Sequence, residues 1–296
     1  MTTPPICDYE DSDYQQVFWD AGERAYEDQV EAVALRHLLP KEGGKRLLEL
    51  GAGTGRNTSR YSGYQQVVLV DYSATQLSQA VERLGDLQKY RYFAADIAHL
   101  PFAPNSFDAA TMIRTLHHIV DVPAVLREVE GVLNGGAAFI LEYANKRNLK
   151  AILRYLLRRQ EWNPFSHETV EFVKLNFNFH PRRVREWLEQ AGFAIERQRT
   201  VSHFRLGWLK KNIPLKLLVG LDALLQPSGE FVQLSPSIFL RARVKRSSPP
   251  LMDKLILRCP GCGYSPLAEQ PQVIICPKCK RRYKVEKGIA DFRLKG

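Results

Sequence analysis

The chain has 296 residues, a length that suits one ordinary domain and a smaller second one. Its composition, with 45% hydrophobic and 25% charged residues, excludes collagen-like, low-complexity and wholly disordered proteins. No stretch approaches the roughly 18–20 apolar residues that a membrane-spanning helix needs. The first residues, MTTPPICDYEDSDY, are acidic and lack the pattern of a signal peptide. We therefore expect a globular, cytoplasmic protein.

The net charge of +10 is unevenly distributed along the chain. Residues 1–145 hold 12 basic and 20 acidic side chains, whereas residues 146–296 hold 30 basic and 12 acidic ones. Such segregation indicates a surface for a polyanion, with RNA as the first choice and an anionic membrane surface as a distant second. Solubility is the alternative explanation of the same pattern.

Short apolar runs alternate with helix-period segments through residues 1–245, which we assign to one domain. A helical cap is expected over residues 9–40. Strands are expected, in order, at residues 46–50, 67–70, 91–94, 107–113, 137–141, 193–204 and 237–244. The alternation predicts an α/β, Rossmann-like fold whose mostly parallel sheet is covered by helices on both faces. Its last two strands are candidates for antiparallel pairing at an edge.

Two helices between these strands have well-marked apolar faces, one around residues 77–84 and one around residues 122–133. We expect Asp121 to cap the second helix and Gly135-Gly136 to end it. Two insertions interrupt the later part of the pattern, at about residues 146–180 and 207–230. A linker at residues 246–254, rich in serine and proline, leads to a second domain at residues 255–296.

The first insertion begins with a basic amphipathic segment, KRNLKAILRYLLRRQ, at residues 146–160. We expect a helix that packs its leucines over the mouth of the active site and leaves its basic face in water. Binding to a membrane surface is the weaker alternative. The second insertion also has a helical pattern, and Pro214 should bend or break it. Insertions at these points would shape a substrate pocket.

The most informative segment is LLELGAGTGRNTSRY, at residues 47–61. A buried strand that ends near Glu49 enters a loop with Gly51, Gly53 and Gly55, and glycine lets a ligand approach the backbone closely. The dinucleotide fingerprint G-x-G-x-x-G is not matched, because Arg56 occupies its sixth position. NAD is therefore disfavoured. A carboxylate beside the loop suits the cationic amino group of S-adenosylmethionine instead.

Acidic residues also follow the next two strands. Asp71 ends the second strand, where its carboxylate can accept hydrogen bonds from both ribose hydroxyls. Asp96 follows the third strand and can reach the adenine amino group. Because the carboxyl ends of parallel strands share one edge, these acids and Glu49 should define one crevice. The alternative is that each acid only caps a helix.

Four of the five cysteines form two C-x-x-C pairs near the C-terminus, separated by 13 residues. This spacing is typical of zinc sites, in which four thiolates surround one Zn²⁺ ion. The predicted ligands are Cys259, Cys262, Cys276 and Cys279. Cys7 stands alone near the N-terminus and has no expected role.

Residues 46 to about 145 resemble the class I S-adenosylmethionine-dependent methyltransferases, in particular the type 11 methyltransferase domain. The resemblance rests on LLELGAGTGR, VVLVDYS, DIAHLPFAPNSFDAATMI and LHHIVDVPAVLREVEGVLNGGAAFILE. It implies a seven-stranded sheet with the last strand antiparallel. It also implies a set of cofactor-binding residues: Glu49, Gly51, Ala52, Gly53 and Gly55 at the methionyl part, Asp71 and Tyr72 at the ribose, Asp96 and Ile97 at adenine, and Arg114 facing the sulfonium.

Residues 251–294 resemble the small zinc-ribbon proteins that partner and activate methyltransferases of the translation apparatus. The cysteine knuckles and the closing Y-x-V-x-x-G-I-A-D-F element carry this second resemblance. In that family the activator is a separate subunit, so this chain resembles an enzyme and its activator fused together. The family's clients modify tRNA, rRNA or a release factor, which agrees with the basic C-terminal part of the chain.

The residues after the fourth strand, IRTLHH at residues 113–118, depart from the N/D-P-P-Y/F motif of many amide and adenine methyltransferases. His117 is a candidate general base, as is His118, although packing at a helix entry is the favoured explanation of both. Glu142 and Tyr143, after the fifth strand, are similarly placed. In the N-terminal cap, Phe18, Trp19 and Tyr26 are candidates for closing over the cofactor or for ordinary packing.

These patterns predict an S-adenosylmethionine-dependent methyltransferase with a C-terminal zinc ribbon, acting on RNA (tRNA or rRNA) or another translation component. One alternative is a small-molecule methyltransferase in which the ribbon only stabilises the fold. The other is a non-catalytic RNA-binding factor built on a methyltransferase fold.

Overall fold

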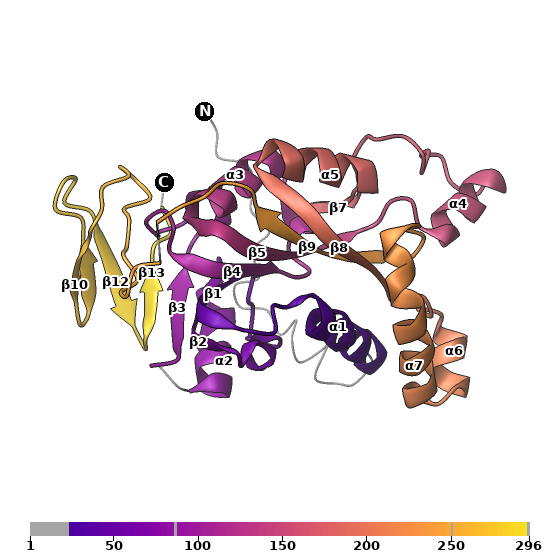
Figure 1. Cartoon of the computed structure of the whole chain (residues 1–296), viewed down its shortest axis with the longest axis horizontal. Coiled ribbons are helices and arrows are strands. Elements are labelled where there is room, and N and C mark those ends of the chain that lie inside the picture. The colour runs from indigo at the N-terminus through magenta and orange to yellow at the C-terminus, as the bar shows by residue number, and fades with distance from the viewer. Residues whose placement is uncertain (1–23, 86–87, 250, 295–296) are drawn as a thin grey trace.

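The computed structural model of the chain describes residues 24–85, 88–249 and 251–294 (Figure 1). Most of the predicted cap at residues 9–40 falls before this range, so Cys7, Phe18 and Trp19 lie outside the described residues. The described part of the cap is helix α1, Ala25–Leu38.

The centre of the molecule is a seven-stranded sheet in the order β3-β2-β1-β4-β5-β9-β8. The first five strands of this order are mutually parallel, and β9 runs antiparallel to both β5 and β8. The predicted Rossmann-like sheet and its antiparallel edge are therefore confirmed. The strands are β1 (Gly44–Leu50), β2 (Tyr64–Asp71), β3 (Tyr90–Ala94), β4 (Phe107–Met112), β5 (Leu133–Ala144), β8 (Phe193–Val201) and β9 (Ser237–Val244).

Helices cover both faces of the sheet because its strands are apolar on both sides. In β1, Leu48 packs in one core with α3 (Val122–Val132) and α5 (Pro181–Gln190). Its neighbour Leu47 points the other way, into a second core with α1, α2 (Ala74–Leu84) and α7 (Leu215–Leu225). The parallel strands are thereby buried, and their carboxyl ends are held at one edge.

The helix that follows β4 begins as predicted and ends differently. The side chain of Asp121 accepts a hydrogen bond from the backbone N–H of Ala124 at 3.0 Å, which caps α3. The predicted stop at Gly135-Gly136 is wrong, since α3 ends at Val132 and Leu133 already has an extended backbone. The glycine pair lies inside β5, and Gly135 has to lack a side chain because a Cβ would meet the backbone of residues 246–248 at about 2.6 Å.

Four short C-terminal strands extend the sheet to eleven strands, an arrangement that the sequence did not predict. They are β10 (Ala268–Gln270), β11 (Val273–Ile275), β12 (Arg282–Glu286) and β13 (Ile289–Asp291). β13 pairs in parallel with β3, and Phe292 donates its N–H to the carbonyl of Ala94 at 2.7 Å. Phe292 also packs 6.0 Å from Phe93, centroid to centroid, so the ribbon shares the core of the larger domain.

The helices of the two insertions stand at the far end of the sheet from the ribbon (Figure 1). The first contains α4 (Leu149–Leu156) and a hairpin of β6 (Val170–Val173) and β7 (Asn176–Asn178). The second contains α6 (Gly207–Asn212) and α7, and the predicted break at Pro214 is confirmed because α7 starts directly after it. Short 3₁₀ helices complete the chain: η2 (Thr58–Tyr61), η3 (Ile97–His99), η4 (Leu116–His118) and η5 (Gln226–Glu230).

Candidate active site and metal centre

A pocket opens at the carboxyl ends of β1, β2, β3 and β4, where the sequence predicts the crevice. Its walls include Glu49, Asp71 and Asp96, the three predicted acids, and Arg114. Gly51, Ala52, Gly53, Tyr72 and Ile97 also line it, whereas Gly55 does not. No residue of α4, α6 or α7 is among the described residues of its wall. The expectation that α4 packs over this pocket is therefore wrong, whereas the first insertion still reaches the wall through the contact of Leu175 with His118.

The three loop glycines have different physical roles. All have positive φ angles, which side chains with a Cβ rarely adopt. A Cβ on Gly51 would lie 2.0 Å from Oγ1 and 2.8 Å from Cβ of Thr115, so packing requires this glycine. A Cβ on Gly55 would lie 2.8 Å from the end of the flexible Leu84 side chain, so there the positive φ is the main reason for glycine. At Gly53 the nearest atom would be 3.9 Å away. Gly53 is therefore the glycine that leaves room for a ligand.

Glu49 is buried at the end of β1 and accepts a hydrogen bond from the hydroxyl of Thr58 at 2.6 Å. Burial raises the pKa of this carboxyl to about 7, and the hydrogen bond and the nearby charge of Arg56 offset only part of the cost of desolvation. A cation bound beside it would favour the ionised form. The site thus has a carboxyl group that responds to a positively charged ligand.

The carboxylates of Asp71 and Asp96 accept hydrogen bonds from backbone N–H groups and also line the pocket. The two carboxylate oxygens of Asp71 accept hydrogen bonds from the N–H groups of Gly53 (2.8 Å) and Ser73 (3.0 Å). Asp96 caps η3 through the N–H of Ala98 at 2.9 Å and contacts Nδ1 of His99 at the same distance. The capping role that we weighed as an alternative is thus real for Asp96, whereas the residue that caps α2 is Ser73 and not Asp71. Backbone hydrogen bonds hold both carboxylates on the pocket wall.

Arg114 lies on the pocket wall with a left-handed backbone, φ 56°. Its N–H donates to the carboxylate of Glu142 at 2.9 Å, and its guanidinium forms an ion pair with Glu31 of α1, with Nε 2.7 Å from the carboxylate. Glu31 also binds the guanidinium of Arg56 at 2.8 Å. Burial alone would raise the pKa of Glu31, but the charges of the two arginines lower it to about 2.

Nothing in the sequence indicated this network. Glu31 is a lone acid in a predicted helix, 83 positions before Arg114, and no local motif connects the two. Only the packing of α1 beside the pocket brings them together. As a result, a carboxylate of the protein, that of Glu31, already balances the positive charge of Arg114.

The two histidines of η4 have different surroundings. His118 lines the pocket, whereas His117, the candidate base, is not among the described wall residues. The ring centroids lie 4.0 Å apart, and Nδ1 of His118 is 2.9 Å from the carbonyl of Leu175, to which it donates. Burial lowers the pKa of both side chains, which favours their neutral forms.

The three other residues considered for the site are buried within the protein. Glu142 is buried and accepts hydrogen bonds from Arg114 and from the hydroxyl of Ser237 at 2.5 Å. Tyr143 is also buried. Tyr26 does not line the pocket, because its hydroxyl donates to Asp222 at 2.6 Å in the core under α7. The packing alternative for Tyr26 is therefore confirmed.

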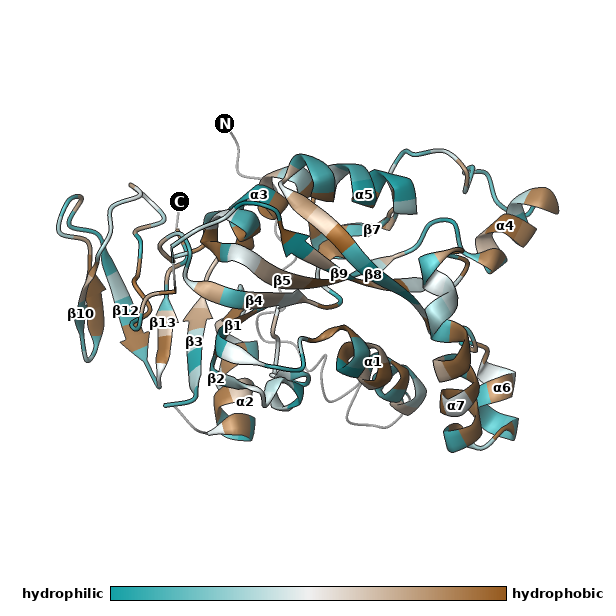
Figure 2. Ribbon diagram, viewed as in Figure 1, coloured by the Kyte–Doolittle hydropathy of each residue, from teal (hydrophilic) through white to brown (hydrophobic). Residues whose placement is uncertain are grey.

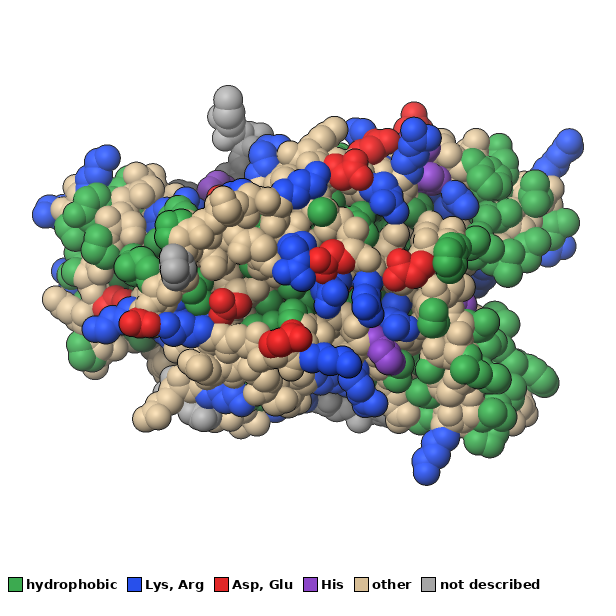
Figure 3. Space-filling model, viewed as in Figure 1, with side chains coloured by type: hydrophobic (Ala, Val, Ile, Leu, Met, Phe, Trp, Pro, Cys, Tyr) green, Lys and Arg blue, Asp and Glu red, His purple; other side chains and the backbone are tan. Residues whose placement is uncertain are grey.

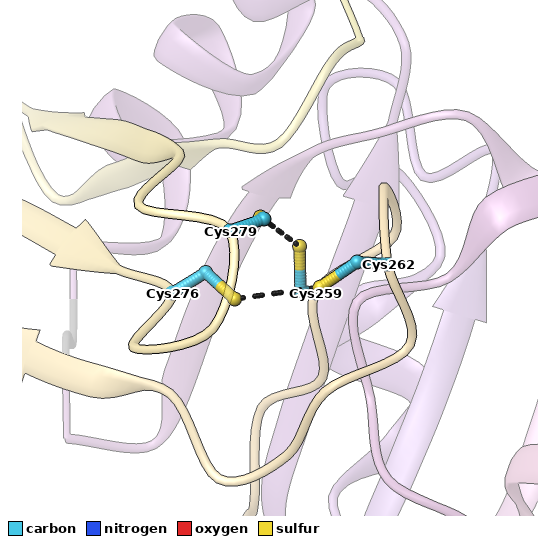
Figure 4. Close-up of side chains that lie close together, drawn as sticks. All are labelled: Cys259, Cys262, Cys276 and Cys279. Atoms are coloured by element: carbon cyan, nitrogen blue, oxygen red, sulfur yellow. Dashed lines mark hydrogen bonds between the residues drawn. The ribbon is translucent and has the colours of Figure 1, made fainter.

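The four predicted metal ligands converge in the ribbon (Figure 4). Their sulfur atoms all lie within 4.8 Å of one another, with Cys259 3.7 Å from Cys279 and Cys262 3.5 Å from Cys276. Sulfur atoms around a tetrahedral zinc ion, with bonds of about 2.3 Å, are about 3.8 Å apart. The hydroxyl of Tyr283 lies 3.0 Å from the sulfur of Cys259, a second layer of support for the site.

Comparisons with known proteins agree with this arrangement. A family model of the methyltransferase domain matches residues 48–141. The demethylmenaquinone methyltransferase of Clavibacter sepedonicus is 28% identical over 189 residues, which are 59% of this chain and 76% of that enzyme. The ubiquinone/menaquinone biosynthesis C-methyltransferase of Teredinibacter turnerae is 27% identical over 168 residues, covering 51% and 68%.

Among solved structures, the chain is similar to one chain in the complex between the Haloferax volcanii Trm112 methyltransferase activator and a methyltransferase. The TM-score is 0.55 at 16% identity, and the match covers 79% of this chain and 96% of that one. At an identity this low, the similarity shows only that the two chains share a fold.

The sheet order, the pocket beside a glycine loop and the domain match together define a class of protein. The chain is an S-adenosylmethionine-dependent methyltransferase. One fold in this class hosts many acceptors, so the class by itself assigns none.

Proposed function

We propose that the pocket holds S-adenosylmethionine through the residues that the sequence singled out. Glu49, Ala52 and Gly53 would hold the methionyl part, Asp71 and Tyr72 the ribose, and Asp96 with Ile97 the adenine. The observation that carries this proposal is the convergence of three carboxyl groups and the open side of Gly53 on one pocket. The cofactor would supply an electrophilic methyl group on a sulfonium.

The chain's own residues would position the acceptor rather than activate it. Methyl transfer to a good nucleophile needs mainly in-line placement. Where the acceptor carries a proton, His118 is better placed than His117 to accept it. Its ring is neutral and lies on the pocket wall, and its Nδ1 proton is held by Leu175, which makes Nε2 the basic atom.

We further propose Zn²⁺ as the ion of the four-cysteine cluster, supported by the fit of the sulfur spacing to a tetrahedral site. Four reduced thiolates need a reducing compartment, so the cytoplasm remains the proposed location. The ribbon would act as a built-in activator, and its pairing with β3, beside the pocket, supports that role.

For the acceptor, we propose RNA or another component of the translation apparatus as the first candidate. The observation that favours it is a group of exposed cations on the ribbon: Lys278, Lys280, Arg281, Arg282 and Lys284.

A small apolar molecule is the second candidate. Its support is the apolar side of the pocket, formed by Ile113, Ile119, Val120 and Val125. The two relatives are named for methyl transfer in the synthesis of menaquinone and ubiquinone, which points to the same class of substrate.

One labelling experiment separates these candidates. The purified chain is incubated with S-adenosylmethionine carrying a radioactive methyl group, together with total tRNA and rRNA or with a quinone-containing lipid extract. Label in the RNA supports the first candidate, and label in the organic phase supports the second. Asp71→Ala, which should bind the cofactor more than tenfold more weakly, serves as the control that should transfer much less label to either. A folded protein that binds no S-adenosylmethionine would overturn the whole assignment.

A further inference from the structure

Two helices of the insertions carry a stripe of exposed leucines with the same spacing. On each helix the leucines recur at positions i, i+4, i+7 and i+8, which places them on one face. In a folded protein such a face is normally buried, yet these side chains are 39–78% exposed. They are Leu149, Leu153, Leu156 and Leu157 of the α4 segment and Leu217, Leu221, Leu224 and Leu225 of α7.

The orientation of both helices is fixed from the opposite side. In α7, the buried Asp222 binds the hydroxyl of Tyr26 and the N–H of His203 at 2.8 Å, so its leucine stripe has to face outward. In α4, the side chain of Asn148 caps the helix, and the N–H of Leu149 donates to the carbonyl of Leu234 at 2.8 Å. The packing of the two helices therefore keeps these leucines exposed.

Other exposed apolar side chains belong to the neighbouring segments, and we call them and the two stripes together the leucine surface. Phe231, which is 88% exposed, and Val232 lie in the segment that leads to Leu234 and so to the start of α4. Trp208, 71% exposed, adds an aromatic side chain from α6. Figure 3 shows hydrophobic side chains gathered at the end of the molecule where Figure 1 places α4, α6 and α7, and Figure 2 shows α7 as strongly hydrophobic.

Cations surround the leucine surface. Residues 146–160 contain six lysines and arginines and no acidic residue, and four of these cations are exposed on α4 and its C-terminal end: Lys150, Arg154, Arg158 and Arg159. Lys211 and Lys216 are exposed beside α7. A second copy of this surface would bring like charges together, which opposes self-association. An apolar face with a cationic border instead complements the headgroups and acyl chains of an anionic bilayer.

We propose that the leucine surface binds the face of membranes that contain anionic phospholipids. Within the described residues, none of the helices has the length and apolarity needed to cross a bilayer, so the contact would be interfacial. This inference does not depend on the identity of the methyl acceptor. For residues 146–160, the sequence favoured packing over the mouth of the active site and gave membrane binding as the weaker alternative. Membrane binding now becomes the favoured interpretation, because the leucines that should have packed over the pocket are exposed.

Vesicle flotation tests the proposal. The full chain should float with vesicles of phosphatidylglycerol and phosphatidylcholine in equal parts, and binding should weaken in high salt. Leu153→Glu/Leu156→Glu should lower the partition coefficient at least tenfold for each leucine, because each substitution removes apolar burial and adds a repelled charge. The matched control is Met252→Glu/Leu294→Glu, which changes two exposed apolar side chains elsewhere. That control should float like the wild type.

A second pair of variants tests the cations. Arg154→Glu/Arg158→Glu should reduce flotation with the anionic vesicles, and the same reversal on the ribbon, Arg282→Glu/Lys284→Glu, should not. All these side chains are exposed, so circular dichroism should show an unchanged fold. The proposal is overturned if the wild type does not float, or if it floats equally with pure phosphatidylcholine. It is also overturned if light scattering shows a dimer that the leucine variant dissociates, because the surface would then join two copies.

Discussion

At the scale of single residues, the same side chains hold the backbone and line the pocket. Asp71 ties the glycine loop to β2 through Gly53 and ties the start of α2 through Ser73. Glu31 of α1 balances the charge of two arginines, Arg56 and the predicted cofactor-binding residue Arg114. The pocket therefore keeps its shape because its charged groups are already bound to the protein, which is what preorganised binding requires.

Replacing Asp71 by alanine should weaken S-adenosylmethionine binding more than tenfold. A hydrogen bond to a charged group is worth about 1.5–3 kcal/mol, and tenfold corresponds to about 1.4 kcal/mol. Titration calorimetry measures the affinity, and circular dichroism checks the fold. Asp253→Ala, which removes a carboxylate exposed in the linker, is the control. Unchanged affinity in a folded Asp71→Ala protein would refute the ribose assignment.

Cofactor binding near pH 7 should release protons from Glu49. In the folded protein the pKa of this carboxyl is raised to about 7 from an ordinary value of 4.5, so its ionisation destabilises the fold as the pH rises through this interval. A bound cation favours the carboxylate and lowers the pKa again. Calorimetry in buffers of different ionisation enthalpy should detect the released protons, and Glu49→Gln should abolish them. Equal heats in every buffer would contradict this role.

At the scale of elements, the ribbon is joined to the pocket by a short chain of contacts. Tyr283 reaches the sulfur of Cys259 and stacks on Phe292 at 4.3 Å. The next residue, Arg293, donates to the carbonyl of Tyr72 at 3.3 Å and lies 5.8 Å from the centre of its ring. Because Tyr72 lines the pocket, we expect that disorder in the cysteine cluster would also disturb the proposed cofactor site.

Purified protein should contain about one zinc ion per chain, and Cys276→Ser should lower the temperature of thermal unfolding. Metal binding and folding are coupled in small thiolate sites. The ribbon here also shares a core with the sheet, so we expect one common transition rather than two. Elemental analysis and calorimetry provide the measurements, with Cys7→Ser as the cysteine control. Metal-free protein with a wild-type transition would argue against a structural zinc site.

Arg293→Ala should reduce the affinity for S-adenosylmethionine by a few fold without removing zinc. The contact of a cation with an aromatic ring at an exposed site contributes about 0.5–1 kcal/mol, and here it holds a residue of the pocket wall. Calorimetry and elemental analysis measure the two effects. Lys284→Ala, on the exposed side of β12, should change neither. Loss of zinc in Arg293→Ala would show that the arginine acts on the ribbon fold instead.

At the scale of the whole molecule, the exposed cations of the ribbon and the leucine surface lie on different elements. The ribbon carries the cations proposed for RNA, and the insertions at the opposite end carry the leucine surface (Figures 1 and 3). The sheet of eleven strands connects the two, with the pocket at the carboxyl ends of its central strands. The two surfaces can therefore be altered independently.

If the ribbon cations bind RNA phosphates, the affinity for total tRNA should fall steeply with salt. Replacing Lys280, Arg282 and Lys284 by alanine should flatten the logarithmic slope by about 0.7 for each single-strand phosphate that is no longer neutralised, because fewer counterions are released. The control replaces Lys211 and Lys216, at the other end of the molecule. Filter binding over a salt series measures the slopes, and a slope unaffected by the ribbon changes would favour the small-molecule acceptor.

Much of the fold is encoded locally. Runs of apolar residues located all seven central strands, as in 237–244, where the predicted and observed strand coincide. The spacing of four cysteines predicted a cluster that the tertiary structure assembles. These patterns are readable because each depends on neighbours in the sequence, through strand alternation, helix periodicity or the short reach of a C-x-x-C turn.

Contacts between distant segments were decided only by the tertiary structure. The pairing of Glu31 with Arg114, the addition of β13 to the edge of β3 and the outward orientation of the leucines on α4 have no local signature. An amphipathic pattern states that a helix has an apolar face but not what that face meets. In this chain the sequence by itself determined the class of enzyme and which acidic side chains and cysteines come together. Packing across the sheet decided which charges balance, where the ribbon attaches and which apolar face is exposed.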